Sequence, residues 1–156
     1  MTSEEACCHG FCSLSQIAIN ENDLKYGELE ENTLAQRLKK AKLLKGLTQE
    51  QLALNTGLSR STINELEAGY RDNITRDTLL KLISVLDPKI ICDDYLNYIL
   101  TQEDNINNLI SLYGKTELGN LLKVHRSTLE RWATGKYQLP KDKFKIIREF
   151  NPQNNK

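Results

Sequence analysis

The sequence predicts an all-α fold. From Thr33 onward, apolar residues recur at the three- and four-residue spacing of helices along most of the chain. Residues that favour helix N-caps precede several of these runs, and glycines follow them, as they do at helix ends. Strand signals are scarce, because the chain has neither alternating runs of valine or threonine nor an Asn-Gly turn.

The first two expected helices each follow a threonine. The first begins at Thr33 and ends near Gly46. In the second, Thr48 is the expected N-cap, Gln51 completes a capping box, and Gly57 supplies the left-handed residue of a tight turn. The apolar residues of the first helix lie on one face: Leu34, Leu38, Ala41 and Leu44.

Three more helices are expected before the middle of the chain ends. Ser59 caps a third helix that stops at Gly69. A fourth begins at Thr75, and Pro88 marks the boundary to a fifth over residues 89–100. The second half predicts helices over residues 105–113, 115–124, 126–134 and 141–150.

A short sequence occurs twice. "RSTINELEAG" begins at Arg60, and "RSTLERWATG" begins 66 positions later at Arg126. In the first copy, Ile63 and Leu66 are three positions apart and therefore share one helical face. The second copy has apolar residues at the same two positions. The other face is polar. Each copy follows a short helix, so the pattern predicts two helix-turn-helix modules.

Charge separates along the chain although the net charge is zero. Residues 1–31 carry seven acidic groups and one basic group, and residues 77–112 carry six acidic and two basic groups. Residues 32–76 hold eight basic and four acidic groups, and residues 113–156 hold ten and four. The two basic blocks are potential phosphate-facing surfaces.

Three of the four cysteines crowd the N-terminus beside His9. Cys7, Cys8 and Cys12 offer thiolates that suit zinc, but the paired knuckles of a zinc site are absent from the sequence. We expect a flexible tail with incidental thiols, no metal site and no cofactor.

The third helix has the composition of a helix that reads DNA. An apolar inner face anchors such a helix, while its outer face reaches base edges in the major groove. Arginine pairs with guanine, asparagine with adenine, and glutamate accepts from the amino group of cytosine. Free backbone amides at the ends of neighbouring helices attract phosphates.

"LTQEQLALNTGLSRSTINELEAG", residues 47–69, resembles the lambda-repressor-like family, the Xre and Cro type of phage repressors and bacterial regulators. The resemblance covers about residues 33–86. It implies a helical bundle in which Lys42 and Glu67 tie the first helix to the end of the third. It implies a phosphate contact by Gln49, and base reading by Arg60, Ser61, Asn64 and Glu65.

The second module has a looser sequence. Leu129 and Trp132 keep the buried frame, whereas Lys123 replaces the turn glycine and Ala133 replaces Glu67. A left-handed lysine costs about 1 kcal/mol or more. DNA contact or a docking role is open for this module. The residues expected to contact DNA if it binds are Lys115, Arg126, Ser127, Glu130, Arg131 and Lys136.

These observations predict four segments. Residues 1–31 form an acidic, flexible arm, 32–86 the Xre/Cro-type domain, 87–112 an acidic helical connector, and 113–151 the second module. The acidic connector should face away from DNA, packing the modules together or forming a dimer interface through Tyr95, Tyr98 and Ile99.

The expected function is sequence-specific binding of double-stranded DNA by a transcriptional repressor, with a homodimer as one option. An alternative is an antitoxin or anti-repressor type of interaction module, with DNA binding secondary or inhibited by the arm. No nucleophile–base pair or phosphate-binding glycine loop indicates an enzyme. No apolar run reaches the length of a membrane span, and the N-terminus lacks secretory features, so we expect a cytoplasmic protein.

Overall fold

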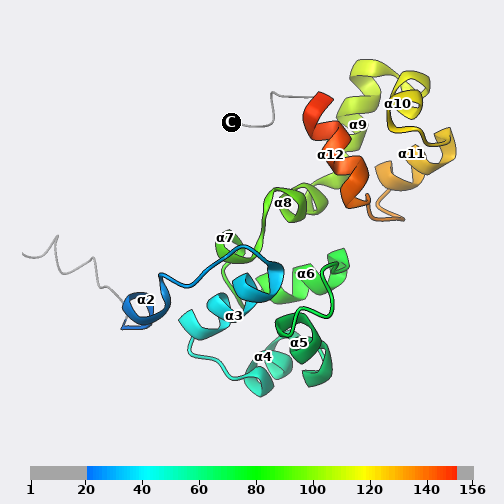
Figure 1. Ribbon diagram of the computed structural model, residues 1–156. Helices are drawn as coiled ribbons and strands as arrows, with labels where there is room; N and C mark the ends of the chain where they lie inside the picture. The colour runs from blue at the N-terminus through cyan, green and yellow to red at the C-terminus, as the bar shows by residue number, and fades with distance from the viewer. Residues whose placement is uncertain (1–20, 151–156) are drawn as a thin grey trace, which may run out of the picture.

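The first helix of the N-terminal module begins where the sequence predicts it. In the computed structural model, which describes residues 21–150, Thr33 caps α3 (Leu34–Leu44) with a complete capping box. The chain continues through α4 (Gln49–Thr56), α5 (Arg60–Glu67) and α6 (Arg76–Ile83) (Figure 1). Thr48, Ser59 and Thr75 cap these three helices through their side-chain oxygens, as predicted.

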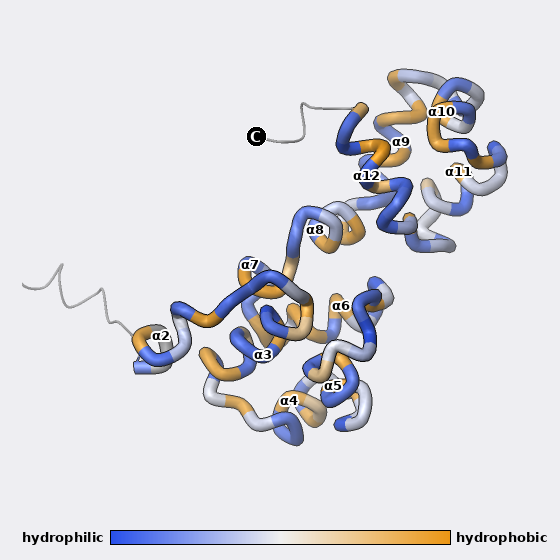
Figure 2. The backbone as a smooth tube through the Cα atoms, in the orientation of Figure 1, coloured by the Kyte–Doolittle hydropathy of each residue, from blue (hydrophilic) through white to orange (hydrophobic). Residues whose placement is uncertain are grey.

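All regular structure within residues 21–150 is helical, which confirms the all-α prediction. We call α3–α6 the first unit. Its helices bury one face each, and the fully buried side chains that form the core between them are Leu38, Leu52, Ile63, Leu66, Leu79 and Leu82. Figure 2 shows the alternation of apolar and polar residues along each of these helices.

The single helix expected over residues 89–100 is wrong. The structure has two short helices there, α7 (Pro88–Ile91) and α8 (Asp94–Leu100), because Cys92 is extended and Asp93 caps α8. Arg37 stabilises this break: its Nε donates to the Ile91 carbonyl at 2.9 Å, and its Nη2 lies 3.0 Å from Asp93 Oδ2. Arg37 therefore satisfies the Ile91 carbonyl, which has no helical partner at the break.

The second unit comprises α9 (Gln102–Tyr113), α10 (Lys115–Leu122), α11 (Arg126–Ala133) and α12 (Lys141–Phe150). Residues up to 112 were expected to be connector, yet α9 packs on α10 and α11 as α3 packs on α5. Equivalent glycines support this pairing. A Cβ on Gly69 would lie closest to Ala35, and one on Gly135 would lie closest to Glu103.

The expected arm is not free along its whole length. A helix, α2 (Glu21–Tyr26), packs on α3, and Lys40 Nζ donates to the carbonyls of Gly27 and Leu29 and pairs with Glu31. In Figure 1, α3 lies between α2 and α5. Residues 21–31 are thus docked on the first unit. The cysteines at 7, 8 and 12 and His9 lie outside the described residues.

None of the helices within residues 21–150 is both long and apolar enough to cross a membrane.

Candidate nucleic-acid interface

The turn between α4 and α5 sets the direction of α5. Gly57 adopts a left-handed conformation at φ 69°, and Ser59 then caps α5 by accepting a hydrogen bond from the Thr62 amide. Ile63 and Leu66 of α5 are almost completely buried, at 0% and 1% exposure. These two side chains anchor one face of α5, so the opposite face is held outward.

That outward face carries the residues predicted to read bases. Arg60, Ser61 and Asn64 are exposed, and Glu65 is half-buried. Three of them take partners within the protein, and the Ser61 hydroxyl donates to Glu65 Oε1 at 3.4 Å. Arg60 Nη1 lies 2.7 Å from Glu50 Oε1, and Glu65 Oε2 lies 2.6 Å from Arg71 Nε. The Arg60–Glu50 pair is well exposed, so its ions remain hydrated and DNA could displace the carboxylate at small cost.

Behind this face, the Glu67 carboxylate contacts two polar side chains. Lys42 Nζ lies 2.7 Å from Glu67 Oε1, and Gln49 Nε2 donates to Glu67 Oε2 at 2.6 Å. Both side chains of the Lys42–Glu67 pair are about nine-tenths buried, with exposures of 10% and 8%. The expected tie between the first and third helices is therefore present. Gln49, predicted to contact phosphate, is held at the start of α4 by the same carboxylate.

The first basic block is not a uniform surface. Arg37, Lys40 and Lys42 are buried on α3 and bind acidic or carbonyl groups of other segments, whereas Lys39 and Lys45 are exposed. The charge count over residues 32–76 therefore overstates the cation density available to phosphate.

The second unit repeats the turn with lysine in place of glycine. Lys123 adopts φ 53° and ψ 48°, and it is the non-glycine residue with positive φ among residues 21–150. His125 caps α11, its Nδ1 accepting from the Ser127 amide at 3.2 Å. Leu129 and Trp132 are buried, which agrees with a core role for the tryptophan.

The outer face of α11 is more highly charged than that of α5. Arg126, Glu130 and Arg131 are exposed and Ser127 is half-buried. Glu130 Oε1 accepts from Lys115 Nζ at 3.0 Å and lies 3.5 Å from Arg126 Nε. The hydrogen bond and charge of Lys115, with a smaller contribution from Arg126, lower the pKa of Glu130. Lys136, also exposed, follows the closing glycine of this unit.

Apart from Lys136, the residues just after the closing glycines were not predicted as part of either site. Tyr70 is 81% exposed at the end of α5, next to the exposed Arg71. In the second unit Tyr137 is 53% exposed, with the Arg131 guanidinium 5.5 Å from its ring centroid. An aromatic and a basic residue directly after each glycine were visible in the sequence and could have indicated this edge of the site.

The described residues contain no group of three or more His, Cys, Asp or Glu placed to hold a metal ion. What the two faces offer is guanidinium, ammonium, amide and carboxylate groups on short helices, the groups that recognise base edges and phosphates.

Comparison with known proteins gives one match. Residues 38–88 match the family model described as Helix-turn-helix, which spans α3 from Leu38 through the start of α7 and includes both α4 and α5. No curated protein and no solved structure matches the chain significantly.

Proposed function

We propose that this protein is a sequence-specific DNA-binding transcriptional regulator, a repressor of phage, mobile-element or bacterial type, because residues 38–88 match the family model described as Helix-turn-helix. The observation that carries the proposal is α5 itself. Its apolar face is buried at Ile63 and Leu66, and the side chains of Arg60, Ser61 and Asn64 lie in solvent on the opposite face. An α-helix with this exposure fits the major groove.

Base recognition follows from the chemistry of the exposed groups. Arg60 donates in a fork that matches guanine O6 and N7, and Asn64 pairs with adenine N6 and N7. Glu65 accepts from the amino group of cytosine. Arg60 must leave Glu50 to do so, and that exposed ion pair contributes no more than about 1 kcal/mol in water.

Phosphate contacts would border α5 on two sides. At the start of α4, the Gln49 side chain is fixed by Glu67 and stands beside the first-turn amides of that helix. At the end of α5, Tyr70 and Arg71 are exposed. Binding in this way occupies an operator and excludes polymerase. Each neutralised phosphate releases counterions, so affinity should fall steeply with salt.

The experiment is selection of bound DNA from a random pool, followed by mobility shifts on the selected site. Arg60→Ala and Asn64→Ala should each lower affinity for that site roughly ten- to hundredfold while leaving non-specific binding nearly unchanged. Lys81→Ala, which removes one exposed cation on α6, is the matched control. If both α5 variants bind the selected site as the control does, α5 does not read bases.

A second candidate function is protein interaction of antitoxin or anti-repressor type. It is favoured by the acidic partners that already occupy cations of both faces, Glu50 on Arg60 and Glu130 on Lys115. Absence of any sequence preference in the selected pool would support this candidate over a regulator.

A further inference from the structure

The two units are copies of one arrangement, although the family match covers the first. α4 and α10 both span eight residues, as do α5 and α11, and α10 and α11 each start 66 residues after their counterparts. Both units hold a left-handed residue in the turn, Gly57 in the first and Lys123 in the second. The second unit thus has the backbone of a helix-turn-helix.

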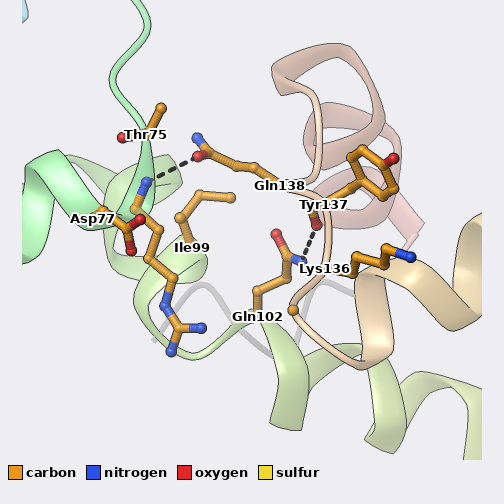
Figure 3. Close-up of a pocket in the computed structure, with 9 residues that line it drawn as sticks. Thr75, Asp77, Ile99, Gln102, Lys136, Tyr137 and Gln138 are labelled. Atoms are coloured by element: carbon orange, nitrogen blue, oxygen red, sulfur yellow. Dashed lines mark hydrogen bonds between the residues drawn. The ribbon is translucent and has the colours of Figure 1, made fainter.

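The loops that follow the two outward helices meet each other. We call this contact, between residues 72–76 and 137–141, the junction. Gln138 Oε1 accepts from the Arg76 amide at 3.1 Å, and Gln138 Nε2 donates to the Ile74 carbonyl at 3.0 Å. Figure 3 shows Gln138 reaching from its loop to the start of α6.

The junction is reciprocal. Arg76, the first residue of α6, reaches the second unit, where its Nη1 donates to Glu103 Oε1 at 2.6 Å. Lys141, the first residue of α12, reaches the first unit, where its Nζ donates to the Asp72 carbonyl at 3.1 Å. The equivalent contacts are those of Gln138 with Arg76 and of Asp72 with Lys141, because Gln138 follows Asp72 by 66 positions and Arg76 and Lys141 each begin the last helix of a unit. Contacts exchanged between equivalent positions are typical of the isologous interfaces of two-fold dimers.

Buried polar groups fix the loop on the side of the second unit. The Gln102 side chain, in a residue 3% exposed, donates to the carbonyls of Trp132 and Tyr137 and accepts from the Leu139 amide at 2.7 Å. Tyr95 donates to the Leu139 carbonyl at 2.7 Å and accepts from Gln138 Nε2. These bonds hold the end of α11 and the start of α12 to α8 and α9, so α5 and α11 are linked through ordered structure.

We propose that a single chain reads a bipartite duplex site, with α5 in one half-site and α11 in a second, unlike half-site. The inference rests on the proposed function of α5 and extends it to the second unit. Arg60–Ser61 and Arg126–Ser127 stand at equivalent positions, whereas Glu130 replaces Asn64. The half-sites should therefore agree where the arginines read guanine, and differ where Asn64 favours adenine and Glu130 favours cytosine.

The test is selection with the full chain, followed by binding of the selected duplex to Arg60→Ala and Arg126→Ala. Each variant should lose roughly tenfold or more in affinity, and each loss should vanish when its own half-site is scrambled. Lys145→Ala on α12 is the matched control for loss of an exposed cation in the second unit. Native mass spectrometry should give one chain per duplex.

The outcomes separate the two proposals. A palindromic site bound by two chains would overturn the single-chain inference, and so would an Arg126→Ala protein that binds as Lys145→Ala does while Arg60→Ala is impaired. In both cases the proposed role of α5 would stand. An Arg60→Ala protein that binds as well as the control would instead overturn the proposed function itself.

A spacing experiment provides a second readout that needs no variant protein. Inserting about five base pairs between the half-sites moves one of them to the opposite face of the duplex, since one helical turn is about 10 base pairs. Two linked readers should then lose roughly tenfold or more in affinity, and an insertion of a full turn should not restore it fully. Equal binding to all three spacings would overturn the inference.

Discussion

At the scale of single residues, Lys123 stands out because its backbone conformation is one that lysine rarely adopts. The residue is exposed, and its amide donates to the carbonyls at the end of α10, at Asn120 and Gly119. The left-handed turn is therefore required by the path between α10 and α11. The equivalent residue of the first unit is Gly57, which adopts the same region without a Cβ penalty.

Replacing Lys123 by glycine should raise the free energy of unfolding by about 1 kcal/mol, because the left-handed strain of an L residue is removed. Urea denaturation measures this change. Lys123→Ala is the control, since alanine removes the side chain and retains the Cβ. A glycine variant no more stable than the alanine variant would contradict the assignment of strain to this position.

Cys92 should be unreactive in the native protein. Burial, with a further contribution from the neighbouring Asp93, raises the pKa of its thiol, and the nearby Arg37 offsets part of this. A raised pKa leaves less thiolate at pH 8 than in a free cysteine, and the thiolate is the reactive form. Iodoacetamide labelling followed by peptide mass spectrometry should therefore modify Cys92 only after denaturation. Equal labelling rates in native and denatured protein would contradict this.

At the scale of elements, the two units use different residues where their first and third helices contact each other. The first unit buries the ion pair of Lys42 and Glu67. In the second unit Ala133 stands at the position of Glu67, and Ile110 of α9 packs against the core. α3 and α9 can be aligned by their buried residues, which are Leu34, Leu38 and Ala41 in α3 and Gln102, Ile106 and Leu109 in α9. In this alignment Ile110 takes the position of Lys42.

This comparison predicts the energetics of the ion pair. Glu67→Ala alone should lower the free energy of unfolding by about 3 kcal/mol or more, because it leaves Lys42 buried without its counter-ion. The double variant Lys42→Ile/Glu67→Ala copies the second unit and should recover most of that loss. Chemical denaturation of both single variants and the double variant gives the coupling energy. Additive losses would contradict the prediction.

At the scale of the whole molecule, the junction decides whether the chain behaves as two independent units or as one body. Its hydrogen bonds join residues more than 60 positions apart in sequence, as between Gln138 and both Ile74 and Arg76. The ion pair of Arg76 with Glu103 adds a partly exposed contact.

Gln138→Ala should lower the free energy of unfolding by about 1–3 kcal/mol, because the Arg76 amide, the Ile74 carbonyl and the Tyr95 hydroxyl each lose a partner. The Arg76 amide, which Gln138 accepts from, should also exchange its hydrogen faster. Asn108→Ala, which removes an exposed amide on α9, is the control. Unchanged exchange at residues 74–78 would show that Gln138 does not hold the two units together.

The sequence predicted the helices of the first unit closely, because capping residues such as Thr48 and Ser59 and the turn residue Gly57 act within a few positions of themselves. It predicted a helix over residues 105–113, within α9, but assigned most of it to the connector and not to the second unit. The buried positions of α9 are displaced by two residues relative to the 66-residue repeat, and one of them is the polar Gln102. Local pattern cannot show that an amide is buried, since its partners lie 30 to 37 residues away.

In the candidate site, too, some features were predictable from local sequence and others depended on distant segments. The outward placement of Arg60 and Asn64 followed from the apolar period of α5, a property of eight consecutive residues. The partners of Lys40 and Arg37 did not follow, because a long cation is buried only where a distant segment supplies oxygen acceptors. By itself, then, the sequence determined the helices of the first unit and the polar face that each one turns to solvent. The tertiary structure decided which charges are used internally and how the two units are joined, because those contacts depend on segments brought together by folding.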